Sequence, residues 1–151
     1  MKLHLGCGGD LKKDYINIDI QSPFDVQHDL RKSLPYKDGS IDEIFSDDVI
    51  QMFSREEWKF VKKDWVRVLK SGGKLDIICW DFIWVLKTFI EHPEIPYNMQ
   101  RIYAGQGDEW DFSKNGFTWE KLVEDFKEEG MTNFVRGPEQ ESSIHLICKK
   151  I

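Results

Sequence analysis

The sequence has only three cysteines, Cys7, Cys79 and Cys148, and no two of them stand in a C-x-x-C spacing. Each stands in an apolar run, so we expect buried, reduced thiols and a cytoplasmic protein. No Cys/His cluster has the spacing of metal ligands, so we expect no metal site. No apolar run reaches the roughly 18 residues that a membrane span needs, and no signal peptide is expected before the first strand.

Positive charge is also scarce, because 21 Lys and Arg stand against 27 Asp and Glu, for a net charge of -6. Binding to a phosphate backbone needs clustered Lys and Arg, so we expect no tight nucleic-acid partner. The length of 151 residues, of which 40% are apolar, is typical of one globular domain. We expect that domain to span residues 1–151.

Short apolar runs alternate with segments of helical periodicity. The expected strands are 2–6, 15–20, 24–29, 41–46, 74–80, 132–137 and 143–150. The expected helices run from the Ser54–Glu57 capping box to Gly72-Gly73, over 82–91, and from Thr118 to Gly130. His92-Pro93 and Pro96 are expected to close the second helix. This alternation predicts an α/β sheet with helices on its faces.

A glycine-rich turn directly follows the first expected strand. Ligands of such sheets bind beyond the C-terminal ends of the strands, and glycine allows a close approach of the backbone. A branched side chain at Gly6 should therefore weaken ligand binding more than folding. Asp19 ends the second strand, where a carboxylate can accept hydrogen bonds from ribose hydroxyls. An ordinary tight turn and a solvated strand-end aspartate would use the same residues.

Two adenosine-containing ligands fit this turn to different degrees. A dinucleotide needs G-x-G-x-x-G and a helix N-terminus for its pyrophosphate. Leu11 stands in place of the third glycine, and too few residues separate Gly9 from Tyr15 for a full helix. S-adenosylmethionine carries no phosphate, so the sequence favours this ligand, with a nucleotide-binding oxidoreductase as the weaker alternative. We expect an irregular turn in place of the first helix.

Four segments together resemble a known family. They are "LHLGCGGD", "YINIDI", "HDLRKSLPYKDGSIDEIFSDDVIQMF" and "WVRVLKSGGKLDIICWDF". The chain resembles a compact class I S-adenosylmethionine-dependent methyltransferase of the methyltransferase-domain type. The resemblance implies a single Rossmann-like sheet, mostly parallel with an antiparallel last strand, and helices on both faces. The short link from Gly9 to Tyr15 departs from the family pattern and predicts a reduced first helix. The resemblance also implies S-adenosyl-L-methionine as cofactor.

The resemblance further assigns residues to the cofactor. Glycines of the first motif would border its methionine and ribose parts, Asp19 would hold the ribose hydroxyls, and Asp29 would accept from the adenine amino group. The implied cofactor-binding residues are Gly6, Cys7, Gly8, Asp19, Ile20, Asp29, Leu30, Ser46 and Asp47.

Methyl transfer requires an aligned nucleophile and, for an alcohol or amine, a group that takes its proton. The carboxylates that could take it are Asp47, Asp48, Asp81, Asp108 and Asp111, and we assign the role to the first three, although each could also be a solvated loop carboxylate. Gln51-Met52 and Ser113 stand where similar family members often carry Glu-His and a His. We expect a small-molecule or sugar-like acceptor. The alternative is a domain that binds S-adenosylmethionine or S-adenosylhomocysteine without its own turnover.

The segment 102–117 is long, aromatic and punctuated by glycine. We interpret it as a lid and acceptor loop. Trp80 and Trp110 lie on segments that lead toward the expected site, where an aromatic face could contact the sulfonium or the acceptor. Ordinary core packing is the alternative.

Overall fold

The computed structural model describes residues 1–21, 23–138 and 141–151. The strands are β1 (Lys2–Leu5), β2 (Ile16–Asp19), β3 (Val26–Gln27), β4 (Ile41–Asp47), β5 (Leu69–Trp80), β6 (Met131–Arg136) and β7 (Ser143–Lys150). The helices are α1 (Arg55–Val68), α2 (Phe82–Glu91), α3 (Pro96–Tyr103) and α4 (Trp119–Glu128), with a 3-10 turn η1 (Ile50–Met52).

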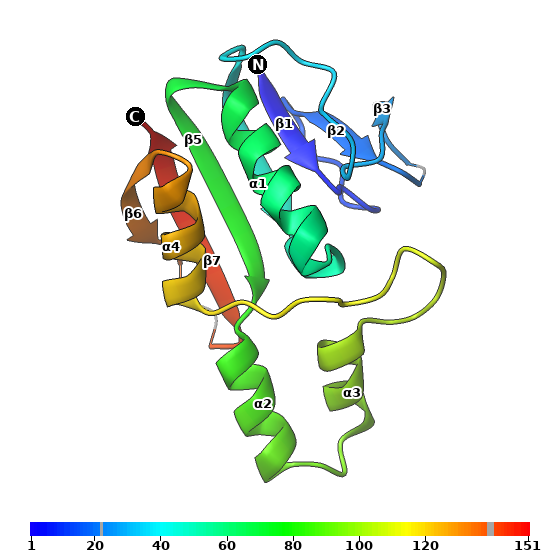
Figure 1. Cartoon of the computed structure of the whole chain (residues 1–151). Helices are drawn as coiled ribbons and strands as arrows, with labels where there is room; N and C mark the ends of the chain where they lie inside the picture. Colours follow the sequence, from blue (N-terminus) through cyan, green and yellow to red (C-terminus); the bar gives the residue numbers. More distant parts are fainter. Residues whose placement is uncertain (22, 139–140) are drawn as a thin grey trace.

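The strands form one seven-stranded sheet in the order β3-β2-β1-β4-β5-β7-β6 (Figure 1). β1 to β5 pair in parallel, whereas β7 runs antiparallel to both of its neighbours. This arrangement confirms the α/β class, the mostly parallel sheet and the antiparallel last strand. It places the C-terminal ends of β1, β2 and β4 along one edge of the sheet.

One face of the sheet carries the hydrophobic core, and α1 and α4 lie on that face (Figure 1). Leu3, Ile44 and Leu75 occupy paired positions on adjacent strands and are fully buried. Trp65 of α1 and Phe126 of α4 belong to the same buried cluster. Burial of each large side chain contributes about 1.5–3 kcal/mol, so the two helices stabilise the sheet from this side.

Polar side chains occupy the other face of the central strands. Glu43 accepts hydrogen bonds from the Tyr15 hydroxyl at 2.7 Å and pairs with Lys74 at 2.6 Å. Lys74 also pairs with Asp76, which lies 2.7 Å from His145 Nε2. In the described part of the chain, no helix lies between β1 and β4. The connections after β2 and β3 therefore lack a helix, as the connection after β1 does. Ionic and hydrogen-bonding contacts take the place of helix packing on this face.

The connection from β1 to β2 is an irregular turn without a helix, which confirms the expectation for this segment. The backbone N–H groups of Gly6 and Cys7 both donate to the Ile18 carbonyl, at 2.8 and 3.2 Å. These bonds fold the turn back over the end of β2. The turn therefore brings the glycine segment directly beside Asp19.

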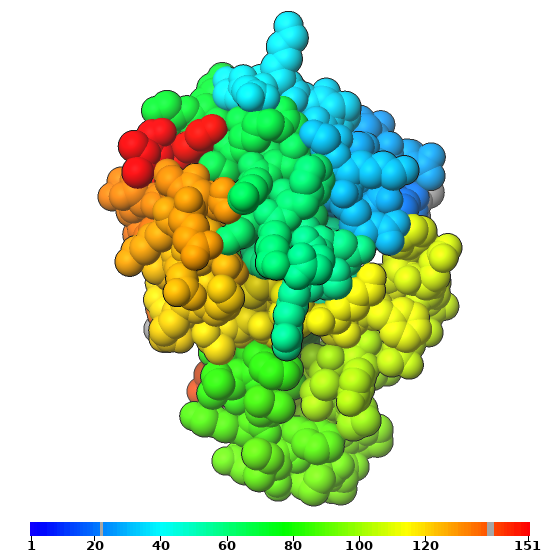
Figure 2. Space-filling view, in the orientation of Figure 1, coloured from blue at the N-terminus to red at the C-terminus, as the bar shows by residue number. Residues whose placement is uncertain are grey.

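Two sequence-based boundaries were wrong. α1 ends at Val68, and the Gly72-Gly73 pair lies within β5, where the pairing with β4 shifts in register. A Cβ atom at Gly73 would lie 2.8 Å from the Lys70 carbonyl oxygen, so the bulge needs glycine there. α2 ends at Glu91, directly before His92-Pro93, whereas Pro96 does not end it but begins α3 as a first-turn proline. α2 and α3 form a lobe beyond the edge of the sheet (Figure 2).

The predicted capping box of α1 is present. The Ser54 hydroxyl accepts from the Glu57 N–H at 3.2 Å, and the Glu57 carboxylate accepts from the Ser54 N–H at 2.7 Å. Ser54→Ala should lower the free energy of unfolding by about 1 kcal/mol, because one helix-end donor loses its partner. Urea denaturation measures this change. Ser71→Ala, at an exposed position, is the control and should stay within about 0.5 kcal/mol of the natural chain; equal midpoints for both variants would contradict a stabilising cap.

Candidate functional site: two adjoining pockets

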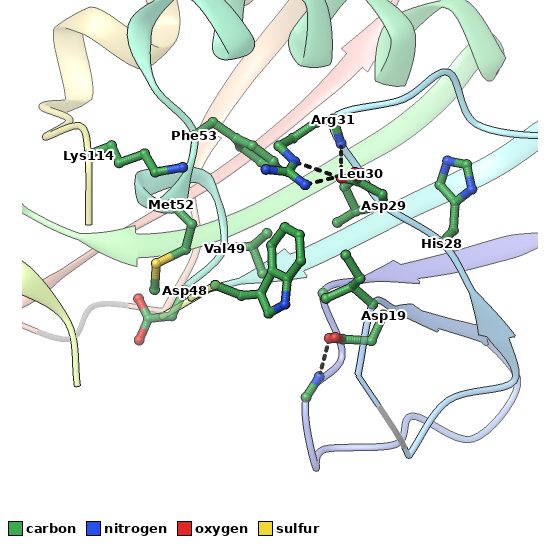
Figure 3. A pocket seen from close by; sticks show the side chains of 14 residues that line it. Asp19, His28, Asp29, Leu30, Arg31, Asp48, Val49, Met52, Phe53 and Lys114 are labelled. Atoms are coloured by element: carbon green, nitrogen blue, oxygen red, sulfur yellow. Dashed lines mark hydrogen bonds and ion pairs between the residues drawn. The ribbon is translucent and has the colours of Figure 1, made fainter. Parts of the chain in front are cut away.

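A pocket opens where β1, β2 and β4 end (Figure 3). Six of the predicted cofactor residues line it: Gly6, Gly8, Asp19, Ile20, Asp29 and Leu30. The remaining lining residues are His28, Arg31, Asp48, Val49, Met52, Phe53, Trp110 and Lys114. We call it the first pocket. Its walls combine backbone glycines, carboxylates and apolar side chains from distant parts of the sequence.

Gly6 lies against Val49, which belongs to the segment after β4. Gly6 has φ +69°, and a Cβ atom there would collide with the Val49 Cγ2 and lie 2.9 Å from its Cγ1. A side chain at Gly6 would therefore clash with the protein itself, and not only with a ligand. The expectation that Gly6→Val weakens binding more than folding is not supported, since the stiff, branched Val49 side chain has little freedom to move.

Asp19 organises the glycine turn. Its Oδ2 accepts a hydrogen bond from the Gly8 N–H at 2.8 Å, and its Oδ1 accepts from the Gln21 N–H at 2.9 Å. Gly8 has φ +50°, and no protein atom lies within 4 Å of the position that its Cβ would take. The turn therefore presents bare backbone and one carboxylate to the first pocket.

Asp29 and Arg31 connect the loop after β3 with the segment 102–117, on the wall of the first pocket that lies opposite Asp19. Arg31 donates to both carboxylate oxygens of Asp29, from Nε and Nη2, each at 2.9 Å (Figure 3). The hydrogen bonds from Arg31 lower the pKa of Asp29. The Arg31 guanidinium also lies 4.4 Å from the centre of the Trp110 ring. Trp110 belongs to the segment expected to form a lid, so this stacking brings that segment to the mouth of the pocket.

Asp48 directly follows β4 and has φ +52°, a left-handed conformation that few residues other than glycine adopt. Burial, followed by the charge of Asp47, raises the pKa of the Asp48 carboxyl to about 6. The carboxyl accepts a hydrogen bond from Gln51 Nε2 at 3.4 Å. A carboxyl with a raised pKa that lines a pocket is a candidate reactive group.

A second pocket adjoins the first and shares Asp48 and Met52 with it. Its other lining residues are Gln51, Trp80, Tyr97, Gln100, Arg101, Ala104, Gly105, Asp111 and Ser113. The segment expected to be a lid and acceptor loop thus supplies residues to both pockets. Sequence analysis did not identify Tyr97, Gln100 and Arg101, because it did not predict α3.

Four predicted residues line neither pocket. Cys7 is buried, and burial raises the pKa of its thiol to about 11. Ser46 is fully buried, and its hydroxyl has no partner among the described residues. Asp47 alternates with Ser46 on β4 and points to the opposite face of the sheet. Asp81 caps α2 by accepting from the Ile83 and Trp84 N–H groups. The roles assigned to these four residues stay predictions.

In residues 1–21, 23–138 and 141–151, no three His, Cys, Asp or Glu side chains group closely enough to hold a metal ion. Within the same described ranges, no helix has the length and apolar character needed to cross a membrane.

Residues 3–77, about half of the chain, match the family model described as "Methyltransferase domain". No curated protein matches the chain in sequence. A possible histamine N-methyltransferase from Thermotoga maritima superposes with a TM-score of 0.69 at 15% identity, over 99% of this chain and 82% of its own. An S-adenosylmethionine-dependent methyltransferase from Methanosarcina mazei gives 0.67 at 18% identity, over 99% and 92%.

A third similar structure is the 1,6-didemethyltoxoflavin-N1-methyltransferase of Burkholderia thailandensis, with a TM-score of 0.65 at 11% identity, over 99% of this chain and 70% of that one. That enzyme was crystallised with S-adenosylhomocysteine and 1,6-didemethyltoxoflavin. At these identities the structures establish the fold, and the family match covers every residue that lines the first pocket except Trp110 and Lys114. The chain belongs to the class I S-adenosylmethionine-dependent methyltransferases, and its cofactor is S-adenosylmethionine.

Proposed function

We propose that residues 1–151 form a single-domain enzyme that transfers a methyl group to a small-molecule or sugar-like acceptor. The observation that carries this proposal is the shared wall of the two pockets. Asp48 and Met52 line both, so a cofactor in the first pocket and an acceptor in the second would meet at these two side chains. Such a meeting point is what an in-line displacement requires.

The residues of the first pocket fit S-adenosylmethionine better than a dinucleotide. A side chain at Gly8 would enter open space beside the pocket, so its absence leaves room for a close ligand. Asp19 offers further lone pairs to ribose hydroxyls. No helix begins between Gly9 and Tyr15, so no helix N-terminus is available for a pyrophosphate.

We propose that these residues hold the cofactor, with Asp29 and Leu30 at its adenine and Ile20 beside its ribose. Cys7, Ser46 and Asp47 would support the turns around it.

When bound, S-adenosylmethionine supplies a methyl carbon activated by its sulfonium. The chain must then position the acceptor, take its proton and exclude water. Asp48 is suited to take the proton, because a carboxyl with a pKa of about 6 is largely ionised at neutral pH yet remains basic. Gln51 orients this carboxyl through its amide N–H. Trp110, stacked on Arg31, would limit access of water to the first pocket.

The alternative function is a domain that binds the cofactor without turnover. Gln51-Met52 and Ser113 favour it, because the acceptor side lacks the histidines often found in similar family members. S-adenosylhomocysteine binding without methyl transfer to any acceptor would support this alternative.

Three free, buried cysteines support the proposed cytoplasmic location. The negative net charge supports a small-molecule partner over nucleic acid.

Asp19→Ala should weaken S-adenosylhomocysteine binding about 30- to 1,000-fold, or roughly 2–4 kcal/mol, because ribose hydroxyls lose a charged partner. Asp19→Asn should also weaken it, since its amide N–H₂ would face a backbone N–H donor at Gly8 or Gln21. Calorimetric titration measures both affinities, with melting temperatures alongside. Asp10→Ala removes the same charge from an exposed position in the same turn and serves as control. If Asp19→Ala binds S-adenosylhomocysteine within about threefold of the affinity of the natural chain, the ribose assignment is refuted.

Asp48→Asn should lower kcat about 100-fold or more, because the acceptor proton loses its base. Asparagine tolerates the left-handed backbone at this position, so folding and S-adenosylhomocysteine binding should change little. In the natural enzyme, kcat should rise with pH through about 6, since the carboxyl must be deprotonated to act. This role is tested by measuring turnover against pH for the natural chain, for Asp48→Asn and for the control Asp10→Asn. An unchanged pH profile in Asp48→Asn would exclude the role.

A further inference from the structure

We propose that the second pocket selects acceptors that carry a carboxylate, which Arg101 binds, and an N–H or O–H nucleophile, which lies at Gln51 and Asp48. This inference rests on the proposed function and specifies its substrate class. It follows from two buried polar groups without partners, one from each end of the same pocket.

Arg101 is held in one orientation by aromatic rings and by Asn98. Its guanidinium carbon lies 4.6 Å from the centre of the Tyr97 ring, 4.9 Å from Trp84 and 5.4 Å from Trp80. Asn98 Oδ1 accepts from Arg101 Nη1 at 2.8 Å, and Asn98 is itself buried with its Nδ2 bonded to the His92 carbonyl at 2.8 Å. A guanidinium stacked on aromatic rings keeps its N–H edge free for a planar anion.

The described residues provide no anion for Arg101. No carboxylate of residues 1–21, 23–138 or 141–151 forms an ion pair with it, and its buried Nε has no hydrogen-bond partner there. Asp111, a carboxylate of the same pocket, instead accepts from the Gly105 and Gly107 N–H groups at 3.2 and 3.1 Å. A buried donor without a partner is costly, so the site is completed by an acceptor group from a ligand.

Gln51 has an acceptor without a partner where the two pockets meet, just as Arg101 has a donor without one. Gln51 Nε2 donates to Asp48, while its Oε1 is buried and has no partner among the described residues. Gln51 is only 7% exposed. An amide oxygen in this position requires an N–H or O–H donor. The group that satisfies it lies beside Asp48, the proposed base, and is therefore the nucleophile.

The charges of the pocket distinguish between kinds of anion. Asp48 and Asp111 also line it, so one arginine faces two carboxyl groups. A singly charged carboxylate meets less repulsion from them than a doubly charged phosphate would. Trp80, Tyr97 and Met52 contribute apolar surface to the same lining. The charges thus favour a small carboxylic acid over a phosphorylated acceptor.

The test compares para-hydroxybenzoate and para-aminobenzoate with their primary amides, titrated calorimetrically into the protein saturated with S-adenosylhomocysteine. At least one acid should bind about tenfold or more tightly than its amide, because only the acid forms a charge-assisted pair. Arg101→Gln should abolish this preference, and Arg101→Lys should retain part of it. Lys87→Gln removes one charge from an exposed position on α2 and should keep the full preference.

Each outcome bears on the proposal. Equal binding of acids and amides, no binding of either acid at millimolar concentration, or an undiminished preference in Arg101→Gln would overturn it. The comparison of acid with amide in the natural chain needs no variant, so it holds even if Arg101→Gln fails to fold.

S-adenosylhomocysteine affinity is measured in the same samples and should be unchanged in Arg101→Gln, because Arg101 does not line the first pocket. Failure of the natural chain to bind S-adenosylhomocysteine would count against the proposed function, whereas bound S-adenosylhomocysteine without acid preference would count against this inference alone.

Discussion

The contact between Gly6 and Val49 is the constraint on which the site depends. Because Gly6 has no side chain, the turn after β1 can lie directly against the segment after β4. Gly8, two residues further along, then lies beside Asp19, while Asp48, next to Val49, lies on the facing wall. A single missing side chain therefore brings the glycine turn and the proposed base to the same pocket.

Trp58 connects this arrangement to the rest of the fold. Its ring lies 5.2 Å from Phe117 and 5.7 Å from Phe126, and its Nε1 donates to Asp125 at 3.0 Å. Phe117 ends the segment that supplies residues to both pockets, so the core of α1 and α4 fixes one end of that segment. Arg31 holds its middle through Trp110. The acceptor side is thus anchored at two points, although it has little regular structure of its own.

Local signals predicted much of the fold. The alternation of apolar residues located the strands, and Ser54 with Glu57 marked the start of α1 because both partners of a capping box are close in sequence. The first pocket was found through motif residues at strand ends. Arg101 and Val49 could not be found in this way, because their roles depend on contacts between distant segments. Pro96 suits both the end of one helix and the first turn of another, and only packing decides between them.

The helix-free connection between β1 and β2 has a consequence for the order of folding. Leu3 pairs with Ile16, only a short loop away, whereas Leu75 of β5 pairs with Cys148 near the C-terminus. Closing a short loop costs less chain entropy than closing a long one, and chains rich in local contacts fold faster. The glycine turn can therefore form early, before the antiparallel half of the sheet joins. On the ribosome, the glycine turn and β2 emerge before β4 to β7, so their local pairing does not have to wait for the later strands.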